Sequence, residues 1–458
     1  MSDRLEAALD FARNNQEQTI KELKEFISIP SISTDPQSDG DIRRAAEWLV
    51  SKLENLGMQN ITIFPTERHP IVYGELLAAG NQKPTVLIYG HYDVQPAEPL
   101  ELWQSPAFEP TMKDDKLFGR GASDMKGQII ATLKAVESLI RTGKMPVNVK
   151  FIFEGEEEIG SPNLEDFIEN NQQLLACDLN LNPDSGMLGP DIPTITYSLR
   201  GLAYFEIRLS GPSRDLHSGL YGGAVHNPAR VLCELIAGMH DKSGRITLPG
   251  FYDAVRPLSE EEREELSRLP ENDGFYLDTS GAPALYGEEG FTAVERVGAR
   301  PSLDVNGLLS GFTGEGSKTV LPATAMAKIS IRLVPDQDPG EIENQLMSYL
   351  EANAPRTVSW EVIPLSSALP SISDRKTKGV AALSKALEET WGVRPVFKRM
   401  GGSIPVVAQM QKLLGVESAL TGFGLPDDNL HAPNEKLHLP TFYKGIDALI
   451  RFFTFVGE

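Results

Sequence analysis

Cysteine is nearly absent: the 458-residue sequence contains two, Cys177 and Cys233. Both stand among apolar residues, so we expect two buried thiols, because a chain of this length does not need a disulfide in order to fold. Basic residues are also in deficit, with 43 Lys and Arg against 64 Asp and Glu and a formal net charge of -21. That balance argues against nucleic acid and against an anionic membrane surface as partners.

Long apolar runs are missing as well. No stretch of the sequence approaches the roughly 18 apolar residues that a membrane-crossing helix needs. The first residues show no basic segment followed by an apolar one, so no signal peptide is expected. These absences predict a cytoplasmic protein with no membrane partner, and the length of 458 residues predicts two domains.

The first part of the chain alternates helix-like and strand-like segments. Apolar residues recur with the helical period over residues 41–56, where Ile42, Ala45, Leu49 and Leu53 share one face. Similar patterns predict helices at 3–27 and 127–141 and strands at 61–64, 71–77, 86–89, 148–153 and 178–182. Strands that alternate with helices indicate an α/β domain with a parallel or mixed sheet.

The pattern changes near Gly201. Side chains alternate between apolar and polar with period two in three predicted strands, as they do in half-exposed strands: 202–209, 327–334 and 358–363. Two helices are expected in the same part of the chain, at 227–239 and 340–352, which makes it an α+β domain. The α/β pattern then resumes, with helices at 376–390, 403–413 and 440–454 and strands at 395–399 and 416–421.

The predicted fold class is therefore α/β with an insertion. A discontinuous domain of residues 1–199 and 368–458 has a central mixed β-sheet flanked by helices, and an α+β domain of residues 200–367 is inserted into it. Open α/β sheets bind their ligands beyond the carboxyl ends of the strands. The residues that follow the predicted strands are therefore the first candidates for a functional site.

Histidine and acidic residues gather at those positions. His91 and Asp93 come directly after strand 86–89, and an imidazole that binds a metal needs a partner on its other ring nitrogen, which Asp93 could supply. Asp124 stands between glycines and ahead of helix 127–141. Each also has an ordinary interpretation, since Asp93 could cap a turn and Asp124 could cap the helix.

Three adjacent glutamates, Glu156, Glu157 and Glu158, follow strand 148–153. Such a run is usually a solvated surface, but at the mouth of a sheet adjacent carboxylates repel one another unless they share a cation. Asp184 and His431 are weaker candidates when each is taken alone. Together, two histidines and several carboxylates match the needs of two divalent ions that share one bridging carboxylate.

Five motifs make the sequence recognisable. They are His-x-Asp at 91–93, Gly-Arg-Gly-x-x-Asp-x-Lys-Gly at 119–127, Glu-Glu-Ile-Gly-Ser at 157–161, Asp-Leu-His-Ser-Gly at 215–219 and Gly-Gly-Ser-Ile-Pro at 401–405. With them the chain resembles, over nearly its whole length, the dinuclear-metal family of aminoacylases, glutamate carboxypeptidases and dipeptidases. The resemblance is strongest to the cytosolic non-specific dipeptidase (carnosine dipeptidase) branch.

The resemblance implies two divalent metal ions in each subunit. His91 and Asp184 would hold one ion, Glu158 and His431 would hold the other, and Asp124 would bridge them. Zinc is the first choice, although manganese and cobalt accept the same ligands.

The resemblance also implies the catalytic residues of the α/β domain. Glu157 would be the general base, Asp93 would orient His91, and the peptide bond between Asp124 and Met125 would be cis. Glu156 is an additional acid where relatives often have an apolar residue, and the spacing to the Gly-Ser at 160–161 favours the pair Glu157 and Glu158.

Further roles fall in and next to the insertion, which the resemblance makes a lid and dimerisation domain of a homodimer. His217 would stabilise the oxyanion, and Arg332 would bind the free carboxylate of the substrate. The segment that contains Gly402 and Ser403 is predicted to open a helix, whose unpaired N–H groups attract anions and would complete the carboxylate site.

The predicted function is hydrolysis of the peptide bond of dipeptides or other short peptides. A water molecule between the two ions attacks the amide, and Glu157 moves the proton. Two alternatives use the same centre, an N-acyl amino acid hydrolase and a C-terminal exopeptidase. A third, from a different class, is a metal-binding scaffold that has lost activity.

Overall fold

The computed structural model describes residues 2–458, which form two compact units. The first unit contains the chain up to Tyr197 together with Ser373–Phe397 and Pro405–Glu458. The second unit contains Ser198–Ile372 and Lys398–Ile404. The short segment Lys398–Ile404 thus lies with the second unit, although the predicted bounds assign it to the α/β domain.

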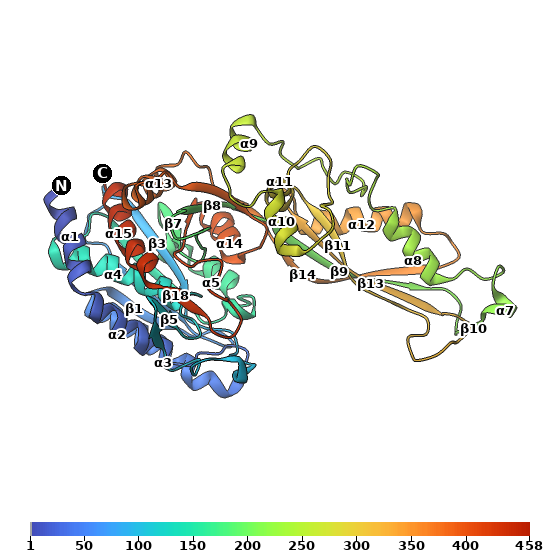
Figure 1. Ribbon diagram of the computed structural model, residues 1–458, viewed down its shortest axis with the longest axis horizontal. Helices are drawn as coiled ribbons and strands as arrows, with labels where there is room; N and C mark the ends of the chain where they lie inside the picture. Colours follow the sequence, from blue (N-terminus) through green and yellow to red (C-terminus); the bar gives the residue numbers. More distant parts are fainter. Residues whose placement is uncertain (1) are drawn as a thin grey trace. The chain divides into compact units, whose positions relative to one another are not determined.

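The described part of the chain contains a nine-stranded sheet, most of whose strands belong to the first unit (Figure 1). Its order is β1-β2-β6-β3-β7-β17-β8-β15, and β16 pairs with β8. The strands are β1 (Gln59–Phe64), β2 (Ile71–Leu76), β3 (Thr85–His91), β6 (Asn148–Glu154), β7 (Leu179–Asn182), β8 (Thr194–Leu199), β15 (Ser371–Ile372), β16 (Val396–Met400) and β17 (Ser418–Leu420). Strands β6, β3, β7 and β17 are parallel, whereas β1 and β2 are antiparallel to their neighbours, so the predicted mixed sheet is confirmed.

Helices from both ends of the chain pack beside this sheet. The first unit contains α1 (Ser2–Asn14), α2 (Gln16–Ile27), α3 (Asp39–Asn55), α4 (Lys126–Thr142), α5 (Leu164–Asn170), α6 (Gln172–Leu175), α13 (Lys378–Trp391), α14 (Pro405–Leu414) and α15 (Leu439–Val456). The last helix, α15, contacts α1, α4 and α13 (Figure 1). It buries Phe442, Leu449 and Phe453, whose spacing places them on one face of the helix, and each such side chain contributes about 1.5–3 kcal/mol when buried.

One helix prediction was wrong in detail. The segment 3–27 forms two helices that are separated at Asn15, not one. The side-chain amide of Asn15 donates to the carbonyl oxygen of Phe11 at 2.8 Å. Asparagine competes in this way with the backbone for hydrogen bonds, which favours a break over a continuous helix.

A small three-stranded sheet in the first unit was not predicted. It consists of β4 (Thr111–Lys113), β5 (Lys116–Phe118) and β18 (Lys436–His438), in the order β18-β5-β4. The loop after β5 leads to Asp124, and the Asp124–Met125 peptide bond is cis, as the family resemblance implies. Strands of three residues are too short to show a period, so the sequence carries no signal for this sheet.

The second unit is an antiparallel sheet with helices. Its order is β11-β13-β9-β14, with β9 (Gly201–Ser210), β11 (Ser302–Ser310), β13 (Thr324–Leu333) and β14 (Ser359–Ala368). Along β13 every second side chain is buried, which confirms the predicted period of two. Helices α8 (Pro228–Ala237) and α12 (Pro339–Asn353) pack on this sheet and share its core, where the hydroxyl of Tyr349 donates to the carbonyl oxygen of Leu235 at 2.8 Å.

The remaining elements of the second unit are short. They are β10 (Leu216–His217), which pairs with β12 (Val320–Leu321), and the helices α7 (Ser218–Tyr221), α9 (Glu260–Ser267), α10 (Asp273–Ser280) and α11 (Ala293–Ala299). The predicted burial of both cysteines is wrong for Cys233, which is exposed on α8, while Cys177 is partly buried. Between residues 2 and 458, none of the helices combines the length and the apolar character that a membrane crossing requires.

Candidate metal centre

The centre begins where three parallel strands end side by side. Strand β3 ends at His91, and β6 ends at Glu154 and continues into a turn of 3-10 helix, Glu157–Ile159. Strand β7 ends at Asn182, two residues before Asp184. Because β3 pairs in parallel with both β6 and β7, the side chains that follow these strands meet at one edge of the sheet.

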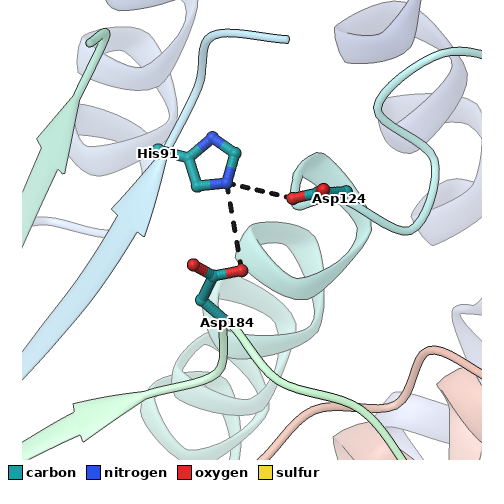
Figure 2. Close-up of side chains that lie close together, drawn as sticks. All are labelled: His91, Asp124 and Asp184. Atoms are coloured by element: carbon teal, nitrogen blue, oxygen red, sulfur yellow. Dashed lines mark hydrogen bonds and ion pairs between the residues drawn. The ribbon is translucent and has the colours of Figure 1, made fainter. Parts of the chain in front are cut away.

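Asp124 lies between two groups of ligand atoms. In the first group, Nε2 of His91 is 3.1 Å from one carboxylate oxygen of Asp124 and 3.9 Å from an oxygen of Asp184 (Figure 2). In the second group, Nε2 of His431 is 3.0 Å from the other oxygen of Asp124 and 3.3 Å from an oxygen of Glu158. Within each group the ligand atoms lie within 4.8 Å of one another, so Asp124 turns one oxygen toward each group.

The ring of His91 is oriented by its own strand end. Its Nδ1 is 3.1 Å from the carbonyl oxygen of Asp93, which can only accept, so Nδ1 carries a proton, and in the neutral ring Nε2 has a free lone pair. The buried carboxylate of Asp93 accepts the backbone N–H groups of Glu157 and Glu158 at 3.2 and 3.0 Å. Gln95, which the sequence did not single out, donates to an oxygen of Glu158 at 2.8 Å.

The electrostatics of the cluster fit a pair of divalent cations. Burial, together with the charge of Asp124, raises the pKa values of Asp184 and Glu157, and it raises the pKa of Glu158 to about 7. Burial alone would also raise the pKa of Asp124, but without metal the charged rings of His431 and His91 donate hydrogen bonds to it and hold its pKa below the ordinary value. Imidazole nitrogens and crowded carboxylate oxygens are suitable ligands for zinc, manganese or cobalt, and divalent cations would relieve the repulsion.

The first glutamate of the acidic run faces other partners. The carboxylate of Glu156 accepts hydrogen bonds from the hydroxyl of Thr66 at 2.9 Å, the backbone N–H of His69 at 2.7 Å and the side-chain amide of Asn163 at 2.8 Å. Glu156 and His69 are both buried. Glu156 therefore joins the segment between β1 and β2 to the segment that follows β6.

His217 belongs to the second unit, where it ends β10 and caps α7. Its Nδ1 accepts the backbone N–H of Gly219 at 3.0 Å, so in the neutral ring the proton is on Nε2. The side chain is exposed. His217 thus has an exposed Nε2–H group on the surface of the second unit, where it can donate a hydrogen bond.

Arg332 and Ser403 lie together in the second unit. Nη1 of Arg332 is 3.4 Å from the hydroxyl oxygen of Ser403, and that hydroxyl donates to the carbonyl oxygen of Arg200. Nε of Arg200 donates to the carbonyl oxygen of Gly401 at 3.1 Å. Burial and the charge of Arg332 lower the pKa of Arg200 to about 10.

Arg200 follows an apolar strand and belongs to none of the sequence motifs, so the sequence alone does not single it out. One correction concerns the helix that Gly402 and Ser403 were predicted to open. Helix α14 begins only at Pro405, a residue that is favoured in the first turn of a helix, so the N–H groups of Gly402 and Ser403 precede the helix.

Comparisons with known proteins identify the family of this chain. The model of the peptidase family M20/M25/M40 matches residues 87–454 of the chain. Cys-Gly metallodipeptidase DUG1 of Candida albicans is 33% identical, over 96% of this chain and 94% of that protein. Beta-Ala-His dipeptidase of Rattus norvegicus is 31% identical, over 99% of this chain and 95% of that protein.

A solved structure shows the same fold. The M20 family metallo-carboxypeptidase Sso-CP2 from Sulfolobus solfataricus has a TM-score of 0.83 and 34% identity, over 96% of this chain and 99% of that chain. The resemblance that the motifs carry is thereby confirmed, and it extends over both units.

Proposed function

This chain belongs to peptidase family M20/M25/M40 and is a metal-dependent hydrolase of peptide bonds, and on that premise we propose that it cleaves dipeptides with two divalent ions. The names of the relatives from Candida albicans and Rattus norvegicus are those of dipeptidases. One observation carries the two-ion proposal: the oxygens of Asp124 face two histidines, each with its own further carboxylate.

In this proposal His91 and Asp184 hold one ion, Glu158 and His431 hold the other, and Asp124 bridges them. Zinc is the first choice for both positions. When bound, the ions lower the pKa of a water molecule and polarise the amide carbonyl. The free lone pair on Nε2 of His91 supports its role, because a ligating histidine donates its other N–H to a carbonyl or a carboxylate.

Glu157 is the general base. It accepts a proton from the attacking water and delivers it to the nitrogen of the leaving amine. Burial and the neighbouring Asp124 and Asp93 raise its pKa, which brings a carboxylate closer to the range that suits proton transfer near neutral pH. Glu156 is a weaker choice, since its carboxylate already accepts from Thr66, His69 and Asn163.

The second unit supplies groups that recognise the substrate. Nε2–H of His217 donates to the oxyanion that forms when the carbonyl is attacked. Arg332, with Ser403 and the N–H of Gly402, binds the free carboxylate of a dipeptide, which selects short peptides. A homodimer formed through this unit is part of the proposal, and the cytoplasmic location remains a prediction from the sequence.

Metal removal and a substrate panel test the proposal. Chelation should abolish hydrolysis of dipeptides, and zinc, manganese or cobalt should restore it.

The general base is tested by substitution. Glu157→Gln should retain both ions and lose about 10²–10⁴-fold in kcat, the usual contribution of a positioned base. Glu156→Gln is the matched control and should retain most of the activity. Full activity in protein shown by elemental analysis to be free of metal would refute the proposal, and an inactive Glu156→Gln beside an active Glu157→Gln would move the base by one residue.

A C-terminal exopeptidase is the second candidate, because a metallo-carboxypeptidase is among the similar structures. Longer peptides and N-acyl amino acids in the same panel separate the three activities. A dipeptidase requires both a free amino group and a free carboxylate, a carboxypeptidase accepts longer peptides, and an acylase prefers a blocked amino group. If the metal-loaded protein hydrolyses none of these substrates, the alternative of a metal-binding scaffold without activity is favoured.

A further inference from the structure

Glu435 is a buried carboxylate that lies behind the metal centre. One of its oxygens accepts the backbone N–H groups of Ser123 and Asp124 at 3.0 and 3.1 Å. The other accepts Nη1 of Arg120 at 2.8 Å and the backbone N–H of Gly121 at 2.9 Å. Four donors from the short loop 120–124 therefore converge on the side chain of Glu435. One of these donors is the backbone N–H of Asp124, the proposed bridging ligand.

The backbone of Glu435 is joined to the same loop. Strand β18 pairs with β5 so that Lys436 lies opposite Phe118, and the carbonyl oxygen of Glu435 then accepts the N–H of Gly119 at 2.9 Å. The register of these two short strands thus places Glu435 beside the loop 119–124. The small sheet that the sequence did not predict is what positions this carboxylate.

The segment before Glu435 contains His431 and does not have a relaxed backbone. Asn429, His431 and Asn434 have φ values of +57°, +58° and +63°, in the left-handed region that residues other than glycine rarely adopt. Such conformations persist only where surrounding contacts enforce them. Within the segment, the side chain of Asn434 accepts the N–H of Gln104 at 2.7 Å and donates to the carbonyl oxygen of Leu102 at 2.8 Å, and further contacts come from the two ends of the segment.

Both ends of the segment are fixed to the Asp124 loop. Before His431, the carboxylate of Asp428 accepts the hydroxyl of Ser123 at 2.9 Å and the N–H of Leu425 at 2.7 Å, and it pairs with Lys436 at 2.7 Å. After His431, Glu435 provides the contacts described above. The loop that contains Asp124 and the loop that contains His431 are therefore held against each other on both sides.

We propose that Glu435 is a positioning residue of the metal centre, which fixes Asp124 and His431 relative to each other and so sets the affinity of the second ligand group for its ion. The inference rests on the proposed two-ion function and deepens it. Glu435 touches neither an ion nor the substrate in this assignment. It acts through the two ligands that share the second ion.

The variant Glu435→Gln tests the proposal with little change in shape. An amide has one acceptor oxygen, so its NH2 group must face either the N–H groups of Ser123 and Asp124 or those of Arg120 and Gly121. In both orientations two donors lose their acceptor and the loop must shift. Hydrogen-bond partners of metal ligands are worth about 10–100-fold in metal affinity, so we expect the dissociation constant of the ion held by Glu158 and His431 to rise by that factor.

The measurement is a zinc titration of the chelator-treated protein by calorimetry, with bound metal counted by elemental analysis. The second readout is hydrogen exchange of the amides of residues 121–124, which should be faster in Glu435→Gln. Activity supplies a third, since excess zinc should restore much of the lost kcat. Glu288→Gln is the matched control, because Glu288 is a buried carboxylate that pairs with Arg245 and Arg300 in the other unit. It should leave both zinc equivalents unchanged.

Two wild-type zinc affinities together with unchanged exchange at 121–124 in Glu435→Gln would overturn the inference. If that variant does not fold, Glu435→Asp decides by the same measurements, because it retains the charge and withdraws the carboxylate by one methylene. Weaker binding of one ion supports the inference, and unaltered binding overturns it. A wild-type protein that binds no metal and remains active would overturn the proposed function itself, whatever the variants do.

Discussion

Asp93→Asn should weaken metal binding without removing any metal ligand. The buried carboxylate of Asp93 accepts two backbone N–H groups, from Glu157 at 3.2 Å and from Glu158 at 3.0 Å. An oxygen of the same carboxylate is 3.5 Å from Nδ1 of His91. Asparagine offers one acceptor oxygen, so one of the two N–H groups must face an NH2 group instead.

The size of the effect follows from that count. A hydrogen bond to a charged group is worth about 1.5–3 kcal/mol, and at least one is lost. Each 1.4 kcal/mol corresponds to a factor of ten in an equilibrium constant, so the loss amounts to roughly 10–100-fold. The displaced turn contains both Glu157 and Glu158, and we therefore expect the zinc affinity and kcat/KM to fall together.

The assay is a competition titration of zinc against a chelator of known affinity, with kcat/KM for a dipeptide measured at saturating zinc. Asp178→Asn is the control. Its carboxylate also accepts one backbone N–H, that of Thr85 at 2.7 Å, but it lies at the opposite ends of strands β3 and β7. Asp93→Asn with the zinc affinity and the kcat/KM of the wild type would refute the reasoning, as would an equal loss in Asp178→Asn.

Four further variants test the rest of the site and the strand beside it. Asp124→Ala should lose both metal ions in elemental analysis, and a variant that still binds two equivalents would contradict the bridging role. In steady-state kinetics, His217→Ala should lower kcat by about 10²–10³-fold, because an oxyanion donor acts only after attack. Arg332→Ala should mainly raise KM and erase the preference for a free carboxylate over a C-terminal amide, and normal kinetics in both variants would remove these residues from the site. Burial raises the pKa of Glu154 from 4.5 to about 8, so between these values the folded, metal-free protein retains a proton that the unfolded chain has released, and its stability falls as the pH rises. Glu154→Gln should therefore flatten the decline of the melting temperature between pH 5 and 8 in the presence of chelator, and parallel curves would contradict the shift.

The elements that the sequence predicted are those with a clear period. Strand β13 alternates buried and exposed side chains, and α15 places Phe442 and Phe453 on one face, so both could be predicted from apolar residues alone. Asn15 divides the first helical segment and Pro405 starts a helix later than expected, because single residues with special hydrogen bonding or geometry outweigh an apolar pattern. The three-residue strands β4, β5 and β18 were invisible for lack of any period.

The candidate site divides in the same way. His91, Glu158 and Asp184 follow predicted strands, and neighbouring parallel strands bring their carboxyl ends together, so this part of the cluster follows from strand order and residue type. His431 was only a weak candidate by itself, because it lies in a long loop after the predicted strand 416–421, and the family resemblance gave it a role. Arg200 and Gln95 carry no motif, and only their contacts identify them.

The sequence by itself therefore determined the chemistry that is available: an acidic chain with histidines and carboxylates at strand ends, in two kinds of domain. These properties depend on residue type and on spacing along the chain, which are local. Tertiary structure alone decided which glutamate of the acidic run turns away toward Thr66 and Asn163, which nitrogen of His91 keeps its proton, and how Glu435 reaches the N–H of Asp124. Each of these depends on a hydrogen bond whose partner is supplied by the folded backbone, and no periodicity along the chain encodes where that partner will lie.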